Sequence, residues 1–219
     1  MKIVRATLCA AFALCTPVAA FAQTAPSDLA SASELTPDDG KADSWTYRNP
    51  DVALTKYQKF IISPTAVHAD PTAQWGKTTP EDRAKYAAYM TQALRTEVGA
   101  GYQIVDKPAP GVATLKLTLL GVSQTVPLLA TASRLTPMGF ALNGIQSLRG
   151  KKGSMTGSAQ VALEVTDSKT GELIFAAVRK RSPVALDIES TLSTEKTVEA
   201  VADDVAKAVR KGIDTANGR

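Results

Sequence analysis

Hydrophobic and polar positions alternate strictly over two stretches of the chain, which predicts β-strands with one buried face. In residues 112–122 the leucines occupy every second position and polar residues fall between them, and residues 159–166 repeat this period of two. The turn sequence 167–171, which ends in glycine, separates the second stretch from a partner strand predicted at 173–178. Two shorter strands are predicted at 60–62 and 102–106.

Two other segments carry apolar residues at the three-to-four spacing of an amphipathic helix. The first is predicted over 80–98, with Thr79 as N-cap, a proline at its first position and Gly99 in the C-cap role. The second is predicted over 194–212, where a valine-rich stripe follows Ser193 in the N-cap position.

The order of these elements predicts an α+β fold, a two-layer sandwich. We expect a mixed, mostly antiparallel sheet of about five strands with two main helices on one face. A single domain is predicted over 52–215, with an insertion at 123–157 between two strands. The apolar spacing within that insertion also allows a third helix, opened by Thr136-Pro137.

The first 22 residues have the pattern of a signal peptide. Lys2 and Arg5 precede an uncharged apolar run, and Ala20-Phe21-Ala22 supplies a cleavage site before Gln23. We therefore predict an exported protein of the periplasm, peripherally associated with the outer membrane, with no transmembrane span once the signal is removed. Leu14 before Cys15 does not fit a lipoprotein signal.

Residues 23–51 are predicted to be a flexible, acidic N-terminal segment. Asp and Glu outnumber Lys and Arg there, and no apolar periodicity is present. Trp45 and Tyr47 are expected to attach the end of this segment to the domain.

Composition excludes several classes of function. Both cysteines, Cys9 and Cys15, lie inside the signal, so the mature chain is predicted to lack disulfides, cysteine nucleophiles and thiolate metal sites. Loss of Lys2 and Arg5 lowers the formal net charge from +4 to +2, which is too small to indicate a nucleic-acid partner. No cofactor fingerprint is present, and no cofactor is predicted.

Basic residues gather in the insertion and in the strand that follows the hairpin. They are Arg134, Arg149, Lys151, Lys152, Arg179, Lys180 and Arg181. One interpretation is a solvated rim around a helix that covers part of the sheet. The other is a docking element for an anionic envelope surface or a protein partner.

The chain shows no arrangement typical of catalysis, so a non-enzymatic protein is predicted. His68 is the single histidine and has no nucleophile elbow to accompany it. Glu164 and Asp167 are the carboxylate pair that an alternative function, an envelope hydrolase acting on peptidoglycan or glycan, would use. A polar sheet face at Glu164 and a turn at Asp167 explain both residues without catalysis.

Several modest motifs resemble one known family. They are Tyr47-Arg48-Asn49-Pro50, Tyr57-Gln58-Lys59-Phe60, Gly101-Tyr102-Gln103-Ile104, and Glu164-Val165-Thr166-Asp167 leading to Thr170-Gly171-Glu172. Over about 45–182 the chain resembles domain of unknown function 3313. This resemblance implies an exported bacterial envelope protein, often a lipoprotein, and it transfers no catalytic residues.

Overall fold

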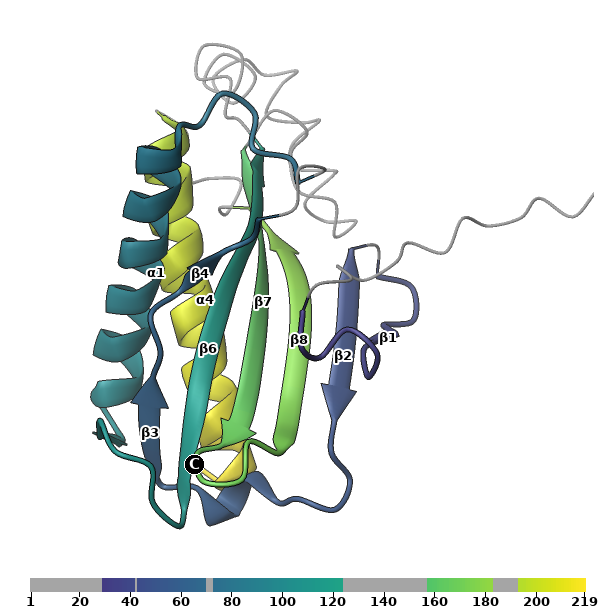
Figure 1. Ribbon diagram of the computed structural model, residues 1–219, viewed down its shortest axis with the longest axis vertical. Helices are drawn as coiled ribbons and strands as arrows, with labels where there is room; N and C mark the ends of the chain where they lie inside the picture. Colours follow the sequence, from purple (N-terminus) through teal and green to yellow (C-terminus); the bar gives the residue numbers. More distant parts are fainter. Residues whose placement is uncertain (1–28, 42, 70–72, 124–156, 183–192) are drawn as a thin grey trace, which may run out of the picture.

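The computed structural model describes residues 29–41, 43–69, 73–123, 157–182 and 193–219. Its strands form one sheet in the order β1-β2-β8-β7-β6-β3-β5, and β4 also pairs with β6 (Figure 1). The strands are β1 Thr36–Pro37, β2 Ser44–Arg48, β3 Lys59–Ile62, β4 Ala66–Val67, β5 Gln103–Ile104, β6 Val112–Ser123, β7 Ser158–Asp167 and β8 Leu173–Arg181. The helices are α1 Pro80–Gly99 and α4 Thr194–Ala216, with a 3-10 turn η1 at Leu54–Lys56.

The fold class is confirmed as α+β with a mixed sheet and two helices. Neighbours from β1 to β6 along the sheet are antiparallel, whereas β3 runs parallel to both β6 and β5. The expected number of about five strands is wrong, because the sheet has eight. The three that were missed are β1, β2 and β4, which have two to five residues each and are too short for a period of two to register.

Two of the missed strands lie in the segment predicted to be flexible, and that prediction is wrong for residues 29–41 and 43–48. β2 pairs antiparallel with β8 along its whole length, with Ser44 opposite Arg179 and Arg48 opposite Phe175. Trp45 is only 4% exposed, in agreement with its expected role as an anchor. Strands β1 and β2 of this segment therefore form one edge of the sheet.

Both helices begin where the sequence predicts. Thr79 and Asp82 form a reciprocal capping box at the start of α1, and Ser193 accepts a hydrogen bond from the Lys196 N–H at the start of α4. Gly99 is the last residue of α1 and Ala100 is the C-cap, so the assignment of Gly99 as the cap is wrong by one position. α4 continues four residues beyond the predicted end at 212.

The core consists of two clusters. In the larger one, Leu115, Leu117 and Leu119 of β6 pack with the buried faces of α1 and α4. The two helices lie side by side in Figure 1, with α4 behind the strands. In the smaller one, Leu29 and Trp45 pack against alternate residues of the central strands, such as Ala162 and Val178. Since successive side chains of a strand point to opposite faces, the N-terminal segment covers the face opposite the helices.

Candidate functional site

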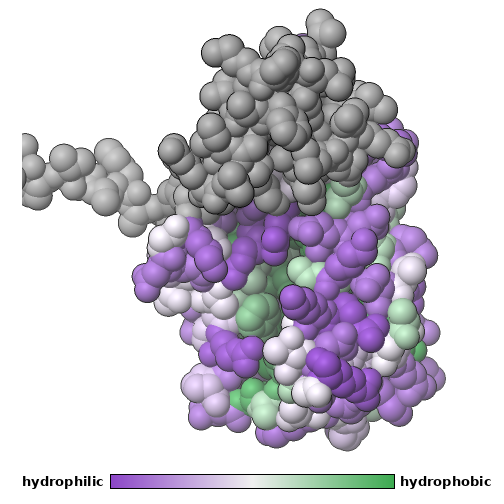
Figure 2. All heavy atoms as spheres, turned by 180° about the vertical axis from the view of Figure 1, so that it is seen from behind, coloured by the Kyte–Doolittle hydropathy of each residue, from purple (hydrophilic) through white to green (hydrophobic). Residues whose placement is uncertain are grey.

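An apolar groove runs between α4 and the strands β6, β7 and β8. Its volume is about 250 Å³. Figure 2 shows hydrophobic residues recessed in the middle of this face, with hydrophilic residues on both sides. Leu163 of β7 and Phe175 of β8 line the groove and remain partly exposed, although both have large apolar side chains. The helix thus leaves part of the apolar sheet face uncovered.

Small residues of α4 keep the groove open. Ala208 and Gly212, one turn apart, line it and are both exposed. A Cβ added to Gly212 would have no heavy atom within 4 Å. Larger side chains at these two positions would extend over the strands and fill the space that the groove now occupies.

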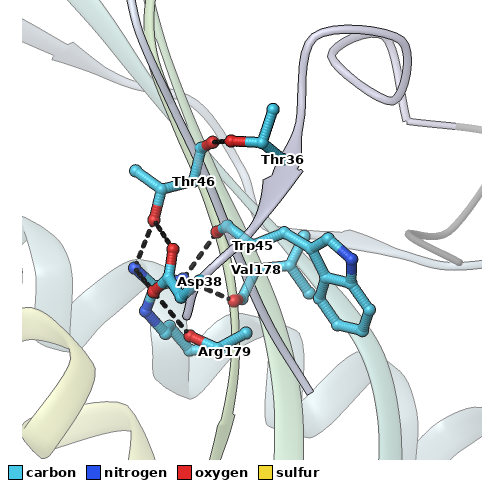
Figure 3. A network of polar contacts seen from close by, with 7 residues as sticks. Thr36, Asp38, Trp45, Thr46, Val178 and Arg179 are labelled. Carbon is cyan, nitrogen blue, oxygen red and sulfur yellow. Dashed lines mark hydrogen bonds and ion pairs between the residues drawn. The ribbon is translucent and has the colours of Figure 1, made fainter. Parts of the chain in front are cut away.

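Arg179, one of the predicted basic residues, lines the groove with its side chain and is fixed by a polar network (Figure 3). Its Nη2 lies 3.1 Å from Oδ2 of Asp38 and donates a 2.6 Å hydrogen bond to Thr46 Oγ1, while Nη1 donates to the Trp45 and Val178 carbonyls. Burial lowers the pKa of Arg179, and the Asp38 charge opposes that change. This network ties β2 to β8 at residues that are 134 apart in sequence.

Asp38 is held in its charged form by the same network. Burial favours the neutral acid, but hydrogen bonds from Thr46 at 2.7 Å and Ser44 at 2.9 Å, with the positive charge of Arg179, outweigh that effect. The pKa of Asp38 is therefore below its usual value. Asp38 neutralises Arg179, which leaves mainly the aliphatic stem of this arginine to line the groove.

Arg181 also lines the groove, whereas Lys180 does not. Nη1 of Arg181 lies 3.7 Å from Oδ2 of Asp204, and its Nε is buried with no hydrogen-bond partner in the described part of the chain. Lys180 is next to it on β8 but belongs to the alternate set of side chains, and its Nζ lies 3.6 Å from Asp43. The structure thus brings two of the seven predicted basic residues to one site.

The other four predicted basic residues, Arg134, Arg149, Lys151 and Lys152, lie outside the described residues, as does the predicted third helix. The two interpretations of the insertion therefore stay as predictions.

Arg48 is a groove residue that sequence reasoning missed. It lies at the end of β2 opposite Phe175 and is exposed, and its guanidinium forms no hydrogen bond or ion pair with other described residues. Arg181 is at the opposite end of β8, so the two arginines lie at the two ends of the groove. The sequence carries no signal for this, because Arg48 sits in an acidic segment and only the β2–β8 pairing brings it to the groove.

The carboxylates of the hydrolase alternative lie away from the groove. Glu164 is 4% exposed and accepts a 3.0 Å hydrogen bond from the Ser31 backbone N–H, with Lys116 Nζ at 3.5 Å. The expectation that Glu164 faces outward on a polar sheet face is therefore wrong, because the N-terminal segment covers it. Asp167 accepts hydrogen bonds from the backbone N–H groups of Thr170 and Lys169.

Those turn hydrogen bonds lower the pKa of Asp167, with a smaller contribution from the Tyr57 hydroxyl. This is the structural role that the turn sequence predicts. Among the described residues, no group of three or more His, Cys, Asp or Glu side chains could hold a metal ion.

Fold and site together define an α+β protein with a mixed sheet and an apolar, arginine-flanked groove. Its sequence matches the model of the family described as "Protein of unknown function (DUF3313)" over residues 25–209. The chain belongs to this family, which confirms the resemblance noted in its motifs. No protein with a curated description matches the sequence.

Solved structures that match this chain come from several bacteria. The PelC dodecamer of Paraburkholderia phytofirmans is 12% identical, covering 78% of this chain and 95% of that one, at a TM-score of 0.40. A DUF330 protein of Xanthomonas campestris is 8% identical, covering 78% and 94%, at 0.37. A DUF4136 protein of Bacteroides thetaiotaomicron is 11% identical, covering 75% and 96%, at 0.35. Similarities this low carry no argument about function or assembly.

In the part of the chain that the structure describes, neither helix has the length and hydrophobicity needed to cross a bilayer.

Proposed function

We propose that this protein is exported to the periplasm and acts there as a non-catalytic accessory or binding protein. Its ligand is an anionic component of the envelope, contacted at the groove between α4 and β8, and the protein is peripherally associated with the outer membrane. Export is supported by the signal pattern of residues 1–22. The binding role is supported by the combination, in a single groove, of exposed apolar surface and an arginine, Arg48, that has no acidic partner among the described residues.

The observation that carries the proposal is the position of Arg48 beside that apolar surface. Arg179 and Arg181 have acidic partners, Asp38 and Asp204, but no described acid pairs with Arg48. An exposed guanidinium next to uncovered apolar side chains favours a ligand that is both anionic and apolar, such as a lipid of the envelope. The basic residues predicted in the insertion have the charge to strengthen attraction to the same surface.

Sedimentation with lipid vesicles tests this proposal. The mature protein should bind vesicles that contain phosphatidylglycerol and should not bind pure phosphatidylcholine, and salt should weaken the binding because it screens exposed charges. Arg48→Gln should weaken binding about two- to fivefold, the effect of losing one exposed ion pair. Arg95→Gln, which removes another exposed arginine, from α1 and away from the groove, is the matched control.

Equal binding to both kinds of vesicle, or equal losses in the two variants, would contradict the proposal. Fractionation of cells expressing the full chain tests the location separately. We expect the protein in the periplasmic and salt-released membrane fractions, and a cytoplasmic location would refute export.

A further inference from the structure

We infer that the groove holds the hydrocarbon chain of a single-chain anionic amphiphile, with the carboxylate or phosphate of that ligand at Arg48. This inference rests on the proposed function and specifies its ligand. It commits to one chain in a defined orientation, running along α4 from Arg48 toward Arg181.

The dimensions of the groove fit a narrow, linear ligand. The α4 residues that line it extend from Val205 to Ile213, which corresponds to about 12 Å along the helix axis. The volume of about 250 Å³ is smaller than the roughly 300–1,000 Å³ of typical small-molecule pockets. A helix from a protein partner, with a diameter of about 10–12 Å, is too thick for this space. A hydrocarbon chain is thin enough to enter it.

The lining of the groove determines which part of the ligand lies where. Between its ends the walls are apolar, with Leu163, Phe175 and Val209 among them, so a charge placed there would lose its hydration without compensation. At one end Arg179 and Arg181 already have Asp38 and Asp204 as partners. The opposite end has Arg48, whose charge is unpaired among the described residues. The anionic group therefore belongs at Arg48 and the apolar tail toward Arg181.

This inference explains why α4 carries small residues where it lines the groove. Glycine within a helix is less favourable than alanine, yet Gly212 lies on the groove with open space at its Cβ position. Together with Ala208 one turn earlier, it leaves the width that a chain needs. Leucine at either position would occupy the path of the ligand.

Isothermal titration calorimetry with dodecyl phosphate, kept below its micelle concentration, tests the inference. We expect one molecule bound per protein, weaker binding of dodecanol, and no binding of inorganic phosphate alone. Ala208→Leu should reduce the affinity for dodecyl phosphate by at least about tenfold. The control is Ala88→Leu, the same substitution at an exposed position of α1 outside the groove, which should leave the affinity unchanged.

Thermal melting of each variant establishes that it is folded, and Gly212→Leu provides a second blocked groove should Ala208→Leu not fold. Full affinity in the blocked variants, or equal binding of phosphate alone, would overturn the inference. If wild-type protein binds anionic vesicles but not dodecyl phosphate, the inference fails while the proposed function stands. If it binds neither, both fail.

Discussion

Replacing Gly212 of α4 with alanine should increase the stability of the protein. Gly212 lies in the last quarter of the helix, four residues before its end at Ala216, and its φ is not in the left-handed region. A Cβ added there would have no heavy atom within 4 Å, so alanine fits without displacing any neighbour. The substitution Gly212→Ala thus changes backbone freedom and helix propensity, and nothing in the packing opposes it.

The expected gain follows from helix propensities. Glycine is about 0.8–1.0 kcal/mol less favourable than alanine in a helix interior, and Gly→Ala at a compatible site stabilises proteins by about 0.4–1 kcal/mol. Because position 212 is in the last turns of α4, where helices fray, we expect about 0.5 kcal/mol. For a protein of this size that corresponds to a rise in Tm of about 1–2 °C.

Urea denaturation measures this change, and Gly171→Ala is the matched control. Gly171 also has no atom within 4 Å of an added Cβ, but its φ is +74°, where alanine is strained by about 1–2 kcal/mol. The urea midpoint should therefore rise for Gly212→Ala and fall for Gly171→Ala, with the m-value unchanged in both. A lower midpoint for Gly212→Ala would refute the reasoning, since it would mean that the position is crowded or not helical.

Three further predictions concern the core and two polar contacts. Leu94→Ala should lower the free energy of unfolding by about 2–5 kcal/mol in urea titrations, because Leu94 is fully buried between α1 and the sheet. Burial, with the hydrogen bond to Asp167, raises the pKa of Tyr57 to about 12, so wild-type stability should fall as the pH rises from about 10 to about 12. Urea titrations across that range should show a smaller fall for Tyr57→Phe, because only the contribution of Tyr57 is removed and the other tyrosines with raised pKa values remain. The pKa of Asp38 is lower in the folded protein than its ordinary value of about 4. The ionised carboxylate therefore stabilises the folded state above that ordinary value, and this stabilisation is lost as the pH falls through the pKa of the folded protein. The difference in urea midpoint between wild type and Asp38→Asn should therefore shrink from about pH 6 to about pH 2, and a constant difference would contradict the role given to the Asp38 charge.

Patterns of hydrophobicity predict the elements with one continuous buried face. Leu115, Leu117 and Leu119 reveal β6 because each alternate residue enters the same core, and the capping sequence at Thr79 locates the start of α1. β2 could not be predicted in this way. Its five residues are partly polar and lie in an acidic segment, and the partner that makes them a strand, β8, is distant in sequence.

The groove was predictable only in part. Arg179 and Arg181 were identified as a basic cluster from local composition, but the sequence does not indicate which of them face the helix side and which have acidic partners. That outcome depends on strand register, which also turns Lys180 to the other face. Arg48 reaches the groove through the pairing of β2 with β8, and the uncovered surface of Phe175 follows from the position of α4 over the sheet; both are properties of tertiary structure.

Pairing of β2 with β8 has a consequence for the order in which the chain folds. Ser44 lies opposite Arg179, so β1 and β2 cannot join the rest of the sheet until nearly all of the chain is available. Contacts so distant in sequence form late and slow folding, because a long loop must close before they form. Until then Leu29, Trp45 and the sheet face that they cover stay open to solvent. A chain truncated before β8 would therefore lack the strand that joins β1 and β2 to the rest of the sheet.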